Sequence, residues 1–158
     1  QLPMSQSTSH SLVYEQSVLI QANATTVERC FTEQKLMHQW LNPALICEPV
    51  GDWRTSVGSE FDFRLKIPLL APTLHSVVVE RAPGLVVWGF DGFFRGRDRW
   101  EAQPEVGGPQ PSTTLLNRFE FTIPNPLVSF GFRQFAASFT KKDMEAQLQR
   151  LKQVAERL

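Results

Sequence analysis

From residue 45 to residue 122 the hydrophobic pattern has a period of two, and Pro and Gly interrupt it at short intervals. In the clearest stretch, Phe61, Phe63, Leu65 and Ile67 alternate with charged residues. Successive side chains of a strand point to opposite faces, so such a strand has one dry face and one face in water. The pattern predicts a meander of about six antiparallel strands, with four of them over residues 74–81, 85–91, 94–102 and 113–122.

The residues before this region predict a strand and two short helices. Residues 14–22 alternate as a strand does. Thr25 and Glu28 have the spacing of a capping box, in which the threonine hydroxyl accepts from the Glu28 amide and the Glu28 carboxylate reaches back. Residues 34–41 carry apolar side chains at helical spacing, and Asn42-Pro43 ends that helix because Pro disfavours a helical residue before it.

A long helix is predicted at the C-terminal end of the sequence. Asn125 caps it, Pro126 suits its first turn, and the helical pattern runs to Leu158. The step from Phe139 to Met144 is out of phase with the rest, so we expect a break, bulge or kink near Thr140. Two apolar stripes therefore lie on the helix, one formed by Val128, Phe132, Phe135 and Phe139 and the other by Met144, Leu148, Leu151, Ala155 and Leu158.

The composition excludes several classes of protein. The 158 residues hold 16 Lys plus Arg against 16 Asp plus Glu. A protein that neutralises many phosphates needs an excess of clustered basic residues, so we expect no nucleic-acid partner. No run approaches the roughly 20 apolar residues that span a bilayer, so we expect no integral membrane association. Residues 1–11 are polar and do not read as an export signal, so we expect a cytoplasmic protein.

The sequence offers no metal site, cofactor site or covalent nucleophile. Cys30 and Cys47 are too far apart for a Cys-x-x-Cys pair and are expected to be buried, reduced thiols. The three His residues lack paired ligand spacing. Phosphate-binding glycine loops and serine-nucleophile motifs are also missing from the sequence. We expect residues 1–12 to form a flexible tail and residues 13–158 to form one domain.

Five short motifs occur in a characteristic order: Trp40–Pro43 as W-x-x-P, Gly51–Phe61 as a glycine-punctuated strand entry, Glu80–Trp88 as E-x-x-P-x-x-x-x-W, Gly92–Trp100 as a glycine-rich strand, and Leu151–Glu156 near the end of the long helix. In this order they resemble the Bet v 1-like or START-like (SRPBCC) superfamily, and within it the polyketide cyclase/dehydrase and lipid-transport group. Relatives often carry His where this chain has Asp98, so family chemistry that uses the His does not transfer.

The resemblance implies an α+β helix-grip fold. A curved antiparallel sheet of about six to seven strands would wrap around the long C-terminal helix, with two short helices after the first strand. A cavity between sheet and helix would hold a hydrophobic small molecule. The composition agrees, because 12 Phe and 4 Trp but only 1 Tyr give aromatic surface that favours a dry environment. We expect the cavity to be lined by Trp40, Phe61, Phe63, Trp88, Phe94, Asp98, Trp100, Asn117, Phe119, Phe132, Phe135 and Phe139, although the same rings could instead fill it.

Asp98 is the exceptional residue of this set. Strand alternation puts its carboxylate on the same face as Phe94 and Trp100, and Asn117 lies on the neighbouring strand within reach. A buried carboxylate is costly unless it is hydrogen-bonded, and its pKa rises on desolvation. Asp98 is therefore either hydrogen-bonded to Asn117, a Trp indole or water, or is a general acid–base residue. His38 either reaches the cavity entrance or is a surface residue of its helix.

These observations favour a non-catalytic protein that binds or carries a lipid-like or polyketide-like molecule. Two alternatives stay open. One is a polyketide cyclase or dehydratase in which Asp98 is the acid–base residue. The other is a protein-binding module like the heat-shock co-chaperones on this fold, which predicts an exposed apolar patch instead of a deep pocket. The oligomeric state is not predicted.

Overall fold

Seven antiparallel strands form one sheet in the part of the chain that the computed structural model describes, residues 11–65, 73–92 and 94–158. The spatial order is β1-β7-β6-β5-β4-β3-β2, so the six strands after β1 form the predicted meander and β1 pairs with the last of them. The strands are β1 Leu12–Ile20, β2 Leu45–Pro49, β3 Glu60–Leu65, β4 Thr73–Ala82, β5 Leu85–Asp91, β6 Arg95–Pro104 and β7 Thr113–Thr122.

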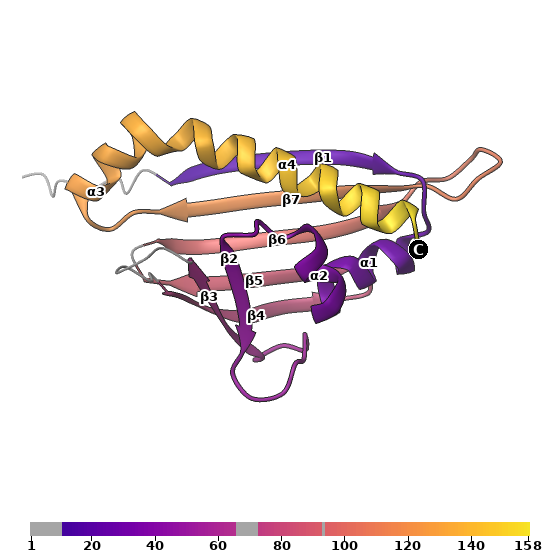
Figure 1. The fold of residues 1–158 in the computed structure, drawn as a ribbon, viewed down its shortest axis with the longest axis horizontal. Coiled ribbons are helices and arrows are strands. Elements are labelled where there is room, and N and C mark those ends of the chain that lie inside the picture. The colour runs from indigo at the N-terminus through magenta and orange to yellow at the C-terminus, as the bar shows by residue number, and fades with distance from the viewer. Residues whose placement is uncertain (1–10, 66–72, 93) are drawn as a thin grey trace, which may run out of the picture.

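The helices cover one face of this sheet. They are α1 Ala24–Thr32, α2 Gln34–Trp40, α3 Pro126–Gly131, the π-helix η1 Phe132–Ala136 and α4 Ala137–Glu156. Figure 1 shows α4 lying across the sheet along β1, with α1 and α2 near its C-terminal half. The α+β helix-grip fold is thereby confirmed, with two short helices after the first strand. No helix in residues 11–65, 73–92 or 94–158 is long and apolar enough to cross a membrane.

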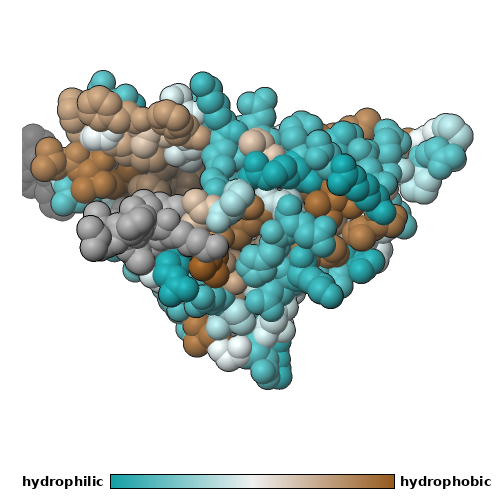
Figure 2. Space-filling view, viewed as in Figure 1, coloured by the Kyte–Doolittle hydropathy of each residue, from teal (hydrophilic) through white to brown (hydrophobic). Residues whose placement is uncertain are grey.

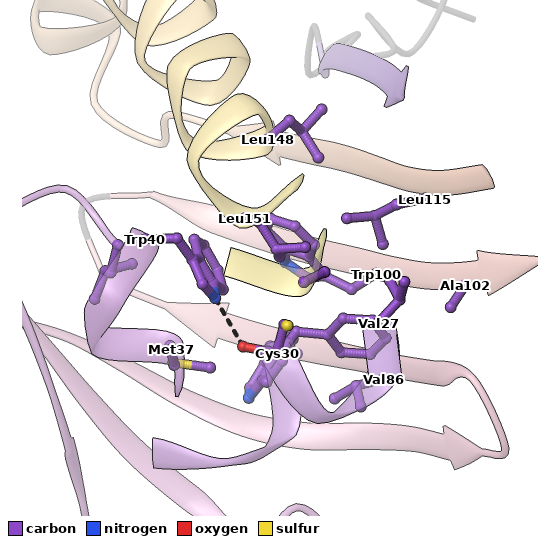
Figure 3. Close-up of a cluster of buried hydrophobic side chains, with 14 of the residues drawn as sticks. Val27, Cys30, Met37, Trp40, Val86, Trp100, Ala102, Leu115, Leu148 and Leu151 are labelled. Carbon is purple, nitrogen blue, oxygen red and sulfur yellow. Dashed lines mark hydrogen bonds between the residues drawn. The ribbon is translucent and has the colours of Figure 1, made fainter. Parts of the chain in front are cut away.

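Two groups of buried side chains stabilise the arrangement, one toward each end of α4. The first joins α1, α2 and the C-terminal half of α4 to the sheet, and Figure 3 shows Trp40, Trp100 and Leu151 converging there. Within it the Trp40 indole Nε1 donates to the carbonyl of Cys30 at 2.7 Å, so burial leaves no unpaired N–H on that ring. The second group consists of Tyr14, Phe90, Phe121, Ile123, Phe132 and Met144.

The predicted capping box at Thr25 and Glu28 is wrong. Asn23 is the N-cap instead, because its side-chain oxygen accepts from the Thr26 amide at 2.8 Å and α1 begins at Ala24. The Glu28 carboxylate is then free to reach the turn between β4 and β5. There it accepts from Arg81 at 2.6 Å and from the Gly84 amide at 2.9 Å, which attaches α1 to the sheet.

The break in the C-terminal helix is real, but it precedes Thr140. The chain forms a π turn over Phe132–Ala136, which inserts one residue and rotates everything before it relative to α4. The buried stripe of α4 runs through Met144, Leu148, Leu151 and Ala155. Extended backwards at helical spacing, that stripe passes through Thr140 and Ala136 rather than through Phe139 and Phe135. The two predicted stripes therefore do not both face the sheet.

Smaller differences concern the ends of elements. β1 begins at Leu12, just inside the predicted tail, and ends at Ile20 rather than Ala22. Residues 1–10 of that tail and the apolar stretch 67–72 lie outside the described residues. β6 starts at Arg95 and continues to Pro104, past the predicted end at Ala102, because its pairing with β7 extends to Thr113.

Candidate ligand-binding pocket

A cavity of about 470 Å³ lies between the sheet, α2 and the helical segment from η1 into α4. Members of both buried groups described above form parts of its wall. Its wall is mostly apolar and aromatic. The lining residues are Met37, Trp40, Leu41, Leu45, Phe63, Leu74, Ser76, Trp88, Phe90, Phe94, Asp98, Trp100, Asn117, Phe119, Phe132, Ala136, Thr140, Asp143, Met144 and Gln147.

Two rows of side chains cross the sheet beneath the cavity, as the strand register shows. One row is Phe61, Ser76, Phe90, Gly96 and Phe121, in which small residues stand between large rings. The other is Val78, Trp88, Asp98, Phe119 and Tyr14. The small Ser76 side chain between two phenylalanines leaves space that a third ring would fill. The aromatic residues therefore line a cavity rather than filling it.

Three of the twelve predicted lining residues are not on the cavity wall. Phe61 lies on the inward face of β3 but is only 1% exposed and packs against Trp53, with ring centroids 4.9 Å apart. Phe135 and Phe139 are 78% and 73% exposed, because the buried stripe of α4, extended backwards, passes through Thr140 and Ala136 instead. Placing these two rings in the pocket was wrong. The wall does include the other nine predicted residues, Trp40, Phe63, Trp88, Phe94, Asp98, Trp100, Asn117, Phe119 and Phe132.

The sequence reasoning missed several polar residues of the wall. Ser76 is buried on β4, and its position opposite Phe61 and Phe90 follows from strand alternation once the pairing is known. Asp143 and Gln147 are one turn apart on α4, where the Gln147 amide donates to Asp143 at 3.0 Å. Asn42 donates to the same carboxylate at 2.8 Å, which joins the end of α2 to α4. In the sequence, only the i, i+4 spacing of Asp143 and Gln147 indicates that these two side chains lie next to each other on the helix.

The Asp98 carboxylate is held by two neutral donors. Asn117 Nδ2 donates to one of its oxygens at 2.8 Å, and Trp100 Nε1 donates to the other at 2.8 Å. The predicted hydrogen bonds to Asn117 and to a Trp indole are confirmed. Burial raises the pKa of Asp98 from its ordinary 3.8 to about 6, although both hydrogen bonds favour the charged form. Asp98 thus changes charge close to neutral pH while facing the cavity.

The other titratable candidates lie elsewhere. His38 is exposed on α2 and is not a wall residue, which agrees with the surface interpretation. Burial raises the pKa of Cys30 to about 11 and that of Cys47 to about 12, so both thiols are protonated near neutral pH. Among the described residues no group of three His, Cys, Asp or Glu side chains is arranged to hold a metal ion. Of the titratable residues singled out from the sequence, Asp98 is therefore the one placed on the cavity wall.

This sheet, this C-terminal helix and the cavity between them define the class of helix-grip ligand-pocket proteins. Comparison with family models makes the assignment: residues 11–156 match the model described as polyketide cyclase / dehydrase and lipid transport, and the chain belongs to that family. No curated protein sequence matches the chain significantly.

Solved structures with the same fold share little sequence with this chain. The Zhui aromatase/cyclase from Streptomyces sp. R1128 is 14% identical with a TM-score of 0.72, covering 94% of this chain and 95% of its own. A START superfamily protein from Mycobacterium smegmatis is 19% identical with a TM-score of 0.61, covering 91% and 94%. Norcoclaurine synthase from Thalictrum flavum, in complex with dopamine and hydroxybenzaldehyde, is 14% identical with a TM-score of 0.65, covering 92% and 86%. At these identities the likeness establishes the fold.

Proposed function

We propose that this protein binds a lipid-like or polyketide-like small molecule in the cavity and carries it without changing it chemically. The observation that carries the proposal is an unfilled, largely apolar cavity of about 470 Å³, in a protein with 12 Phe and 4 Trp residues. Small-molecule pockets typically measure about 300–1,000 Å³ and combine apolar walls with a few placed polar groups. The family's link to lipid transport supports the same conclusion. The buried free thiols of Cys30 and Cys47 support a reducing setting such as the cytoplasm.

Filling the cavity is expected to abolish binding of an apolar probe. N-phenyl-1-naphthylamine is uncharged and fluoresces in dry surroundings, so titrating it reports the free volume directly. Ser76→Trp, on the sheet side, and Thr140→Trp, on the helix side, should each weaken its binding by at least about tenfold, a change of roughly 1.4 kcal/mol.

The matched control is Ser138→Trp, which adds the same ring on the exposed side of α4. It should leave the affinity for the probe unchanged. Two filling variants are used because either could disturb packing, and circular dichroism verifies their folding. Probe binding that survives both folded variants would refute the cavity as the site.

The second candidate is a cyclase or dehydratase in which Asp98 moves the proton. The observation in its favour is a cavity-facing carboxyl with a pKa of about 6, which suits general acid–base chemistry near neutral pH. An aromatase/cyclase is among the structures of the same fold. An Asp98→Asn variant that keeps full turnover of a substrate would exclude this role. The co-chaperone alternative predicts an exposed apolar patch instead of a deep pocket. The structure has an exposed apolar surface but also a cavity, so this alternative receives less support.

A further inference from the structure

Both formally charged side chains on the cavity wall are acidic. Asp98 projects from β6 and Asp143 from α4, and the wall formed by the described residues contains no Lys, Arg or His. The groups that hold the two carboxylates are neutral: Asn117 and Trp100 for Asp98, and Asn42 and Gln147 for Asp143. The negative charge that these side chains bring to the cavity is therefore not balanced within the wall.

These carboxylates can accept further hydrogen bonds. A carboxylate offers about four lone-pair positions, and at Asp98 each oxygen accepts from one side chain. Both residues line the cavity, whose other surfaces are mainly apolar and aromatic. A ligand group that donates hydrogen bonds, and above all a cationic one, would complete this capacity and offset the charge. An anionic head group would stand near two carboxylates in a poorly screened space without a counter-charge.

We propose that the ligand is an apolar molecule with a hydrogen-bond-donating head, preferentially a protonated amine, and that carboxylate and phosphate heads are disfavoured. This proposal rests on the proposed function, since it names the chemical class that the cavity takes. Asp98 contacts the head from the sheet side and Asp143 from the helix side. The ring-lined remainder of the cavity holds the apolar body.

The test compares three ligands that share one ring system and differ in the head: 2-(1-naphthyl)ethylamine, 2-(1-naphthyl)ethanol and 1-naphthaleneacetate. Each displaces N-phenyl-1-naphthylamine from the wild-type protein near neutral pH. We expect the amine to bind most tightly and the carboxylate at least about tenfold more weakly. Asp98→Asn and Asp143→Asn should each reduce the ratio of amine to alcohol affinity severalfold. Glu145→Gln, which removes an exposed carboxylate of α4 away from the cavity wall, should not change that ratio.

The outcomes separate the two proposals. If neither the probe nor any of the three ligands binds, the proposed function itself fails. If the ligands bind with equal affinity, or the carboxylate binds best, the cavity is a binding site but the inferred class is wrong. Retention of the full amine preference in both Asp variants also overturns the inference, because the discrimination would then arise elsewhere.

A second and independent observation concerns the outer side of the segment from α3 to the start of α4. The four most exposed large apolar side chains there are Leu127 at 79%, Phe130 at 62%, Phe135 at 78% and Phe139 at 73%. Figure 2 shows apolar residues gathered at the end of the molecule where α3 lies. We call these four residues the outer aromatic face. Exposed apolar surface of this kind marks a site of contact with another apolar phase or molecule.

The charge of this segment differs from that of the whole chain. Residues 121–142 contain no Asp or Glu but include Arg133, Lys141 and Lys142, in a chain whose net charge is zero. All three are exposed, and none has an ion-pair partner among the described residues. Phe135, Phe139 and Lys142 follow one another at spacings of four and three, which places them along one side of the helix. Exposed rings and the Lys142 cation therefore share one surface, whereas Lys141 Nζ lies over the Tyr14 ring, 5.1 Å from its centroid.

We infer that the outer aromatic face docks on the surface of an anionic lipid membrane. Rings that insert at the headgroup level, beside basic residues that attract anionic lipids, are the combination found in interfacial helices. A protein partner would need acidic groups to match the same cations and is the competing explanation. Phe132, Ala136 and Thr140 of this same segment line the cavity, so docking would bring the cavity wall to the lipid surface.

Vesicle co-sedimentation tests this inference. The protein should pellet with vesicles of phosphatidylcholine and phosphatidylserine, and much less with phosphatidylcholine alone or at high salt. Phe135→Ser with Phe139→Ser, and separately Lys141→Gln with Lys142→Gln, should each weaken pelleting by about tenfold. Val106→Ser is the control, because Val106 is fully exposed in the loop between β6 and β7 at the opposite end of the molecule (Figure 1).

No pelleting with the anionic vesicles, or undiminished pelleting of both double variants, would overturn the inference. Sedimentation velocity without lipid gives the remaining outcome. If the wild-type protein self-associates, does not bind vesicles, and becomes monomeric in the Phe double variant, the outer aromatic face is a contact between copies of this chain and the membrane proposal is wrong.

Discussion

Gly96→Ala is expected to destabilise the folded protein severely. Gly96 lies on β6 opposite Phe121 of β7. A Cβ at this position would collide with the carbonyl oxygen of Glu120 and lie 2.7 Å from the Phe121 Cα. Both are backbone atoms of the paired strand β7, so no side-chain rotation relieves the overlap. We expect a loss of more than about 3 kcal/mol in the free energy of unfolding, above the roughly 1–3 kcal/mol that side-chain overpacking typically costs, because here backbone atoms must move.

The control for this prediction is Gly131→Ala. Gly131 ends α3 with ordinary helical dihedrals, and a Cβ there would meet no atom within 4 Å. Alanine should leave stability unchanged or raise it by up to about 1 kcal/mol, because it restricts the unfolded chain. Urea denaturation followed by Trp fluorescence measures both variants. An equal, small effect of the two substitutions would show that β6 and β7 are not as close at Gly96 as the structure has them.

Most of the sheet could be predicted from the alternation of apolar and polar residues along each strand and from the turn residues between strands. The strand β7 was predicted at its observed bounds, Thr113–Thr122, because the Pro-Gly-rich residues 103–112 precede it and Pro124 and Pro126 follow it. β5 was likewise predicted at Leu85–Asp91. The long helix was harder, because its N-terminal part has a good apolar stripe of its own. Only the packing of Phe132 against Phe94 and Phe121 decides which part of that stripe faces inward.

The site could be predicted only where strands supply it. Asp98 and Asn117 share a face with the rings through strand alternation, and the register of β6 and β7 then brings them together. Ser76 was missed because a single small polar residue in an apolar strand gives no signal until its neighbours are known. Asp143 and Gln147 were missed for another reason. On an amphipathic helix, polar residues beside the buried stripe are normally solvated, and only the cavity beneath α4 makes them wall residues.

Asp98 should make the protein more stable in mild acid than at neutral pH. Its folded-state pKa of about 6 lies above the ordinary value of 3.8, so folding takes up a proton between these two values. The stabilisation is complete below about pH 4 and is lost as pH rises through about 6. A shift of this size corresponds to about 3 kcal/mol at full effect. The free energy of unfolding of the wild type, minus that of Asp98→Asn, should therefore fall by about this amount between pH 4 and pH 7.

Other carboxylates act in the opposite direction, which is why the difference from the variant is the useful quantity. The hydrogen bond and charge of Arg95 lower the pKa of Asp91, so Asp91 contributes stability above its ordinary pKa of 3.8 that is lost as pH falls. For Asp91→Asn, the unfolding free energy of the wild type minus that of the variant should therefore change with pH in the opposite direction. This change should occur below about pH 4. Urea denaturation at matched ionic strength across this range measures both variants.

A difference for Asp98→Asn that does not vary with pH would mean that the carboxylate is solvated in the cavity, and that its negative charge there costs little free energy. Since an unbalanced charge at Asp98 also underlies the expected preference for an amine, that preference should then be weak as well.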